Sequence, residues 1–167
     1  VVPIAEALQM ARDGRMTDGD SALALLRCEA HLTSPRRQVE IAPYDPQWPR
    51  LFQAEAARLG VVFGDELVSL HHMGSTAVPD LPAKPVVDIL AVVRNIARVD
   101  DLNTTLQALG YTPKGEYGIA GRRYFSLDTG GRRRFQLHVY GQGNTEIARH
   151  LDFVAHLRAH PDAAAAY

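Results

Sequence analysis

The residue types best suited to chemistry are concentrated between positions 71 and 90. An apolar segment ends at Gly74 and Ser75, Lys84 follows, and Asp88 lies inside a nearly continuous apolar run. Glycine allows a backbone to approach a ligand closely, and the N–H groups around a hydroxyl side chain can bind an anion. Lys84 would add a positive charge. The segment predicts a phosphate site, although Gly74 and Ser75 alone would equally suit a plain turn.

Asp88 needs an explanation of its own, because it is a carboxylate within an apolar strand pattern. Burying an unpaired charge is costly, so the carboxylate should face a metal ion, a cation or a polar cleft. The structural alternative is an ion pair with Lys84 or with an arginine. Both interpretations stay open at the level of the sequence.

Further candidates lie in two segments of alternating pattern, 122–127 and 135–140. His138 lies in the second segment and could help to surround a phosphate. Adjacent strand residues point to opposite faces, so at most one of Arg122 and Arg123 should enter a cleft, and the other interpretation is an exposed hairpin surface. The predicted phosphate-binding residues are Gly74, Ser75, Lys84, Arg122 and Arg123.

Two other groups of basic side chains have weaker patterns. One of His71 and His72 is a candidate metal ligand or general base, and the other should pack or hydrogen-bond. Residues 132–134 are three consecutive arginines. We expect them to form a solvated loop, because no aromatic platform for nucleic acid accompanies them.

Hydrophobic periodicity assigns these residues to a small set of elements. Strands are expected at 67–73, 85–93, 122–127 and 135–140, with a hairpin turn at 128–131, and helices at 45–60, 99–109 and 144–157. The segment 85–93 is apolar on both faces, as in a central buried strand. Strands interleaved with covering helices predict a two-layer α+β or α/β domain.

The chain has 167 residues and a formal net charge of −1, which argues against a DNA-coating protein. Its longest apolar stretch is too short to cross a bilayer, so we expect no membrane partner. We see no signal peptide and therefore expect a cytoplasmic protein, and the charge balance makes a nucleic-acid partner unexpected. Residues 1–32 suggest two short helices and residues 33–38 a linker, which leaves 39–167 as the main domain. Cys28 is the single cysteine and can form no internal disulfide.

Several motifs together resemble the GrpB family. They are HMGSTAVP (72–79), AKP (83–85), VDI (87–89), GRRYF (121–125), LHV (137–139) and YDPQWP (44–49). The resemblance covers residues 38–167. It implies an α+β fold in which helices cover a mixed β-sheet, the architecture of the nucleotidyltransferase superfamily typified by polymerase β.

In that superfamily a Gly-Ser at a strand end grips a triphosphate, and two carboxylates about a dozen residues later hold two Mg²⁺. Twelve residues separate Ser75 from Asp88, which would be the metal ligand. Leu90 occupies the second carboxylate position, however, and Gln136 replaces the first histidine of a frequent His-x-His pattern. Mg²⁺ is therefore a candidate cofactor at Asp88, but ordinary two-metal transfer is not expected.

The resemblance thus implies a domain that binds a nucleotide or another phosphorylated small molecule without standard two-metal catalysis. Two alternatives stay open. One is an active nucleotidyl- or phosphotransferase with an atypical site of Asp88 and His138. The other is a non-catalytic interaction or folding-accessory domain of a larger fused enzyme.

Residues 1–32 are similar to the C-terminal helices of Nudix ADP-ribose pyrophosphatase-type hydrolases. The catalytic Nudix box is absent from this sequence. This second resemblance implies that residues 1–32 are the tail of an upstream Nudix-like domain, which would then be a partner of residues 39–167.

Overall fold

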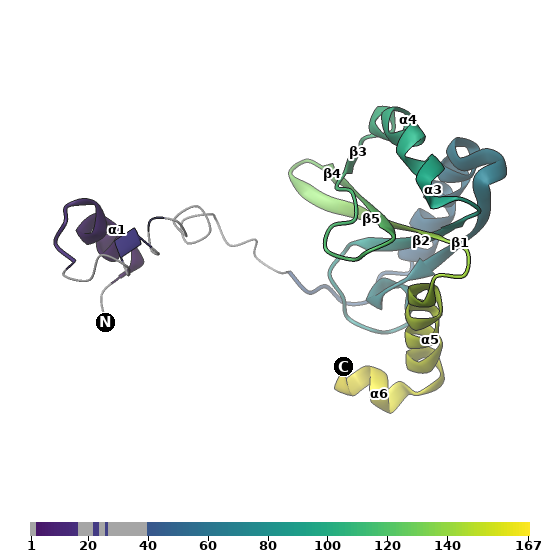
Figure 1. The fold of residues 1–167 in the computed structure, drawn as a ribbon. Coiled ribbons are helices and arrows are strands. Elements are labelled where there is room, and N and C mark those ends of the chain that lie inside the picture. The colour runs from purple at the N-terminus through teal and green to yellow at the C-terminus, as the bar shows by residue number, and fades with distance from the viewer. Residues whose placement is uncertain (1–2, 17–21, 24–25, 27–39) are drawn as a thin grey trace. The chain divides into compact units, whose positions relative to one another are not determined.

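The computed structural model describes residues 3–16, 22–23, 26 and 40–167, and it divides the chain into two compact units, Val1–Val39 and Glu40–Tyr167. The first unit contains helix α1 (Ile4–Arg12; Figure 1). Gly14 follows this helix with a φ of 68°, in the left-handed region. The helix predicted at this position is confirmed. The second predicted helix lies largely outside the described residues, and the predicted linker 33–38 lies wholly outside them.

A five-stranded mixed sheet forms the centre of the second unit, in the order β1-β2-β5-β4-β3 (Figure 1). The strands are β1 (Leu67–Met73), β2 (Val87–Val93), β3 (Tyr111–Pro113), β4 (Arg122–Thr129) and β5 (Arg132–Gly141). Strands β2 and β5 run parallel, and the other neighbours run antiparallel. Gly130 and Gly131 form the hairpin turn with positive φ, as a type I′ turn requires. The predicted α+β fold with a mixed sheet is confirmed.

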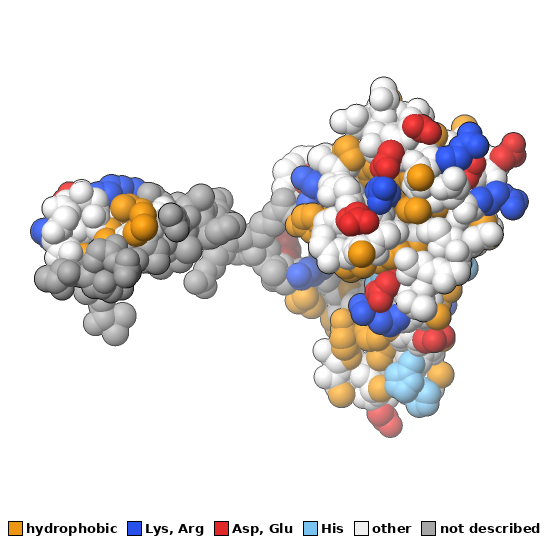
Figure 2. Space-filling view, viewed as in Figure 1, with side chains coloured by type: hydrophobic (Ala, Val, Ile, Leu, Met, Phe, Trp, Pro, Cys, Tyr) orange, Lys and Arg blue, Asp and Glu red, His pale blue; other side chains and the backbone are white. Residues whose placement is uncertain are grey.

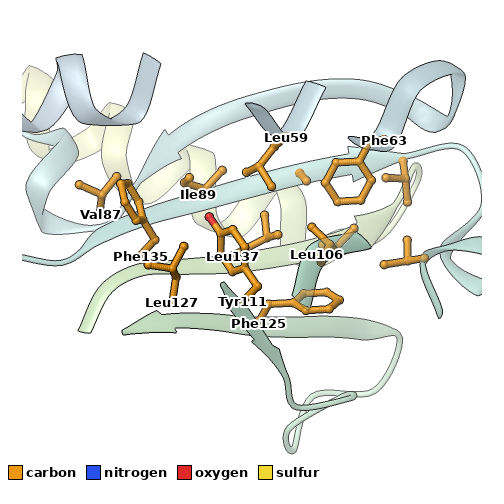
Figure 3. Packing of buried hydrophobic residues seen from close by; sticks show 14 of the residues in the cluster. Leu59, Phe63, Val87, Ile89, Leu106, Tyr111, Phe125, Leu127, Phe135 and Leu137 are labelled. Carbon is orange, nitrogen blue, oxygen red and sulfur yellow. The ribbon is translucent and has the colours of Figure 1, made fainter. Parts of the chain in front are cut away.

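Helices cover both faces of this sheet. They are α3 (Trp48–Phe63), α4 (Asn103–Ala108), α5 (Thr145–Ala159) and α6 (Pro161–Ala166), with 3₁₀ turns at Gly64–Glu66, Ser75–Ala77 and Ile96–Leu102. The larger core lies between α3, α4 and one face, where Leu59, Ile89, Leu106 and Leu137 are completely buried (Figure 3). On the other face, side chains of α5 pack against Leu90.

The two cores explain the nearly continuous apolar sequence of β2. Ile89 belongs to the core under α3, whereas Leu90 belongs to the core under α5. Because side chains alternate along a strand, Asp88 shares its face with Leu90. The central strand predicted from the sequence is therefore confirmed, and its one carboxylate lies on the α5 side of the sheet.

Two elements differ from the predicted set. Strand β3 was not expected, because three residues are too few for an alternating pattern to show. The helix predicted at 99–109 is a 3₁₀ turn that continues as α4. In the described part of the chain, no helix has the length and apolar character needed to cross a membrane. Acidic and basic side chains are interspersed over the face shown in Figure 2.

A buried carboxylate ties the edge strand β3 to α3. Glu55 is 4% exposed and accepts hydrogen bonds from the Tyr111 hydroxyl at 3.1 Å and from Arg58 Nη1 at 2.7 Å. A carboxylate at this depth is stable only when its oxygens are paired. The Tyr111 hydroxyl therefore stabilises the sheet edge through Glu55.

We expect Tyr111→Phe to lower the free energy of unfolding by roughly 1–3 kcal/mol, because it leaves an oxygen of a buried carboxylate without its partner. Chemical denaturation followed by circular dichroism measures the change. Tyr167→Phe removes the same atom from a residue that is 69% exposed, so it should leave stability unchanged. Equal stability of Tyr111→Phe and the wild type would contradict the role given to this hydroxyl.

Candidate functional site

Asp88 is held against the loop that follows β1. In the sheet register it pairs with Met73 of β1 and with Gln136 of β5. Gly74 comes directly after Met73 and adopts a φ of 72°, which glycine accepts without steric cost. A Cβ atom at this position would overlap Asp88 Oδ2. The glycine predicted to bind phosphate therefore touches the predicted carboxylate, and a larger residue would not fit between them.

Hydrogen bonds fix the turn after this glycine. Thr76 Oγ1 donates to the Val86 carbonyl at 3.2 Å and lies 3.0 Å from His72 Nε2. Arg158 of α5 donates through Nε and Nη2 to the Ala77 carbonyl, at 3.0 and 2.7 Å. The turn is thereby tied to the segment that enters β2 and also to α5.

Both histidines of β1 belong to this framework. His72 stacks on Phe52, with ring centroids 5.1 Å apart. Burial, together with the positive charge of Arg158, lowers the pKa of His72 to about 4, so its imidazole is neutral at pH 7. His71 Nε2 lies 2.8 Å from the Ser69 hydroxyl. These contacts account for both histidines without a ligand.

Arg122 is 6% exposed, and its guanidinium is occupied by the protein. Nε donates to the Glu116 carbonyl at 3.2 Å, Nη2 donates to the Tyr117 carbonyl at 2.7 Å, and Nη1 lies 3.4 Å from His138 Nδ1. The guanidinium carbon is 5.1 Å from the centre of the Tyr124 ring. Arg122 is therefore fixed by the protein and contacts His138 on the Nδ1 side of its ring.

His138 has one nitrogen bound and one without a partner. Among the described residues, its buried Nε2 makes no hydrogen bond, and the nearest carboxylate oxygen is Asp88 Oδ1 at 3.9 Å. That separation is too long for a direct hydrogen bond. Burial, followed by the positive charge of Arg122, lowers the pKa of His138 to about 3. A neutral imidazole and a carboxylate thus face each other unpaired.

Asp88 has the shifted pKa that lies closest to 7 in this region. Its side chain is 26% exposed, and within the described part of the chain no hydrogen bond reaches its oxygens. Burial raises the pKa of Asp88 to about 7, while the positive charge of Lys84 acts in the opposite direction. The ion pair with Lys84 that the sequence left open is not formed. Asp88 therefore gains or loses its proton near pH 7.

The structure brings four of the predicted site residues together, around Asp88 on the α5 side of the sheet. Asp88, His138 and Arg122 are in successive proximity there, and Gly74 lies against Asp88, whereas Ser75 is placed only by following Gly74 and Lys84 only by the effect of its charge on Asp88. Arg123 is not brought to them, because its guanidinium donates to both carboxylate oxygens of Asp100, at 2.7 and 2.9 Å. The two adjacent arginines therefore have different surroundings.

Two further side chains border the site. Tyr124 is buried, and its ring centroid lies 5.1 Å from that of His138. Arg133 donates to the Tyr124 hydroxyl at 3.1 Å and to Asp128 at 2.7 Å, and its side chain is only 20% exposed. The predicted loop at 132–134 is therefore wrong, because these residues begin β5, and the predicted solvation holds for Arg132 and Arg134 but not for Arg133. Tyr124 could have been found from its alternation with Arg122.

The donors around Asp88 do not fit a pair of magnesium ions. Leu90, at the second carboxylate position, is completely buried in apolar packing. Among the described residues, no group of three or more His, Cys, Asp or Glu side chains could hold a metal ion. Mg²⁺ prefers several oxygen ligands, and the single carboxylate of Asp88 provides too few for two ions.

Within the site, Asp88 is partly exposed and His138 is buried. A cavity of about 770 Å³ lies elsewhere, between the loop at 78–82 and helices α5 and α6, and Arg158 and Tyr167 line it. A smaller cavity of about 330 Å³ lies beside Phe63. Asp88 and His138 line neither of them.

We expect Asp88→Asn to raise the melting temperature at pH 8.5. The folded protein holds a proton at Asp88 up to a pKa of about 7, whereas an unfolded aspartate releases it near 3.8, so ionisation costs stability as the pH rises between these values. The gain should be on the order of 2 kcal/mol, reduced by partial exposure of the group. It should shrink as the pH falls through 7 and vanish near pH 4.

Asp100→Asn is the matched control with the opposite sign. The hydrogen bonds from Arg123 hold the pKa of Asp100 below its usual range, so the wild-type carboxylate stabilises the fold near neutrality and loses this effect on acidification. Asp100→Asn should therefore be less stable than the wild type at pH 8.5. Identical melting curves for Asp88→Asn and the wild type at that pH would show that Asp88 is not a buried charge.

Residues 38–167 match the family described as GrpB protein. UPF0157 protein YqkA of Bacillus subtilis is 48% identical over 147 residues, which cover 88% of this chain and 42% of YqkA. This alignment is longer than the family match, so part of the segment before residue 38 also has a counterpart in YqkA. The chain spans less than half the length of this relative.

Two solved structures extend the comparison. Cid1 poly(U) polymerase is 18% identical with a TM-score of 0.49 over 71% of this chain and 39% of that one, a similarity too low to carry an argument. GrpB from Enterococcus faecalis is 38% identical with a TM-score of 0.75, over 77% of this chain and 78% of that one. By its sequence match over residues 38–167, which this shared fold supports, the chain belongs to the GrpB (UPF0157) family.

Proposed function

We propose that the domain of residues 39–167 binds a phosphorylated small molecule, with nucleotides as the first class to test, beside Gly74, Ser75 and Asp88. The proposal does not include a two-metal reaction, because Asp88 is a single carboxylate. Membership of the GrpB family supports the comparison with nucleotide-binding folds through the shared sequence motifs alone. The ligand class rests on the chemistry of the site.

The observation that carries the proposal is the buried Nε2 of His138, which has no hydrogen-bond partner among the described residues and faces Asp88 at 3.9 Å. Buried polar atoms in folded proteins are nearly always paired, and exceptions call for a missing partner. A ligand oxygen at this position would supply one. Asp88 lies directly against Gly74, so the same ligand would meet the Gly-Ser turn.

The Gly-Ser side of the site offers groups suited to phosphate. The Ser75 hydroxyl is partly exposed, and no described residue hydrogen-bonds to it. Lys84 is exposed and close enough to Asp88 for its charge to act on that carboxyl. A hydroxyl donor and an ammonium group can together bind a phosphate oxygen. The guanidinium groups of Arg122 and Arg123 are already held by the protein.

Titration calorimetry against ATP, ADP and inorganic pyrophosphate, each with and without MgCl₂, tests this function directly. We expect saturable binding of at least one probe, and at least about tenfold weaker binding by Lys84→Met, because a charge-assisted hydrogen bond is lost. Lys114→Met is the control, since it removes the only other lysine of the sequence. Absence of saturable binding to all three probes would eliminate the proposal.

The protonation of Asp88 favours a second candidate, an atypical nucleotidyl- or phosphotransferase. A carboxyl with a pKa of about 7 is well suited to accept a proton from an attacking hydroxyl at neutral pH. Release of phosphate or pyrophosphate from nucleoside triphosphates would be measured in the presence of small alcohols. Asp88→Asn should abolish the release while keeping a native circular dichroism spectrum. A wild-type protein that releases nothing from any triphosphate would rule this candidate out.

A further inference from the structure

The two facing groups at the centre of the site differ in hydrogen-bonding character. Asp88 offers oxygen lone pairs when ionised, and His138 offers one ring nitrogen whose role depends on the position of its proton. The contacts of Arg122 decide that position. The identity of the group that fits between Asp88 and His138 can therefore be derived from the structure.

Arg122 acts on His138 as a donor only, since a guanidinium has no lone pair to offer. Its Nη1 lies 3.4 Å from His138 Nδ1, so Nδ1 is the accepting nitrogen. The direction of Nη1 is fixed, because Nε and Nη2 are bound to the carbonyls of Glu116 and Tyr117. The lowered pKa of His138 keeps the ring neutral. The single ring proton therefore resides on Nε2 and points toward Asp88.

The distance between the two groups suits one bridging oxygen atom. Asp88 Oδ1 and His138 Nε2 are 3.9 Å apart. An oxygen about 2.8 Å from each of them would see the two atoms at an angle of about 90°, somewhat narrower than the tetrahedral angle, at ordinary hydrogen-bond distances. Such an oxygen must accept a hydrogen bond from His138 and donate one to Asp88.

While Asp88 is ionised, a hydroxyl group meets both requirements and an unprotonated phosphoryl oxygen does not, because the phosphoryl oxygen cannot donate and would be repelled by the carboxylate. We propose that Asp88 and His138 together bind a hydroxyl group of the ligand, and that Arg122 is the positioning residue that gives His138 the required proton position. This inference rests on the proposed function, since the Gly-Ser turn beside Asp88 would hold the phosphate. The ligand class is then a phosphate ester that carries a free hydroxyl, such as a sugar phosphate or a ribonucleotide.

Matched ligands test the hydroxyl directly. Calorimetry compares glycerol 3-phosphate with propyl phosphate, and ATP with its 2′-deoxy and 3′-deoxy forms. In at least one series we expect the form that lacks a hydroxyl to bind about tenfold or more weakly, because a buried donor and acceptor are left unpaired. His138→Phe should bind both members of that series equally, since it keeps a ring and removes the donor.

Two outcomes separate the failure of this inference from the failure of the proposed function. If no phosphorylated probe binds, both are overturned. If the probes bind but every hydroxyl-bearing form and its deoxy form have equal affinity for the wild type, the phosphate site stands. The Asp88–His138 pair then holds only water, and the hydroxyl assignment is wrong.

The role of Arg122 can be tested in the wild-type protein, without a ligand and without a variant. Nitrogen-15 spectra of the histidine rings in the wild-type protein distinguish protonated from unprotonated nitrogens. We expect His138 to show a proton on Nε2 and none on Nδ1. A proton on Nδ1 would overturn the positioning role of Arg122. Where Arg122→Gln folds, its amide can either donate or accept, so the preference for Nε2 should weaken.

Discussion

The burial of one unpaired carboxylate is the constraint around which this domain is arranged. Asp88 lies on a central strand whose neighbours leave its oxygens without a hydrogen bond in the described part of the chain. A fold selected only for stability would place an apolar residue there. Gly74, after β1, leaves room for the carboxylate because it has no side chain. His138 of β5 presents a nitrogen without a hydrogen-bond partner among the described residues.

Much of the framework could be predicted from the sequence, because its physical causes are local. The apolar run of β2 required burial on both faces, and the twelve residues between Ser75 and Asp88 gave the chain enough length to return beside β1. Alternation along the strand then fixed the face of Asp88. These inferences needed only strand geometry and the cost of burying a charge. Strand β3 is too short to give such a signal.

The partners of the arginines could not be predicted in the same way, because they come from distant segments. Arg122 is held by carbonyl groups of the preceding loop, whose conformation no sequence pattern specifies. Arg123 pairs with Asp100, from the 3₁₀ turn before α4. Arg133 reaches Tyr124 across a register shift between Leu127 and Asp128. Charge composition indicates that such pairs exist, but the fold decides which ones form.

The same contacts bear on the two positions at which the expected metal ligands are replaced. An imidazole that accepts from Arg122 and carries its proton on Nε2 has no lone pair free for a cation. Leu90, in place of a second carboxylate, completes the packing under α5, and Gln136 places a neutral residue beside Asp88 in the sheet register. With one carboxylate, one donor imidazole and a neutral amide, the surroundings favour a ligand held by hydrogen bonds. Leu90, Gln136 and the proposed proton position of His138 therefore agree with the proposed binding of a hydroxyl-bearing phosphate ester, which needs no pair of metal ions.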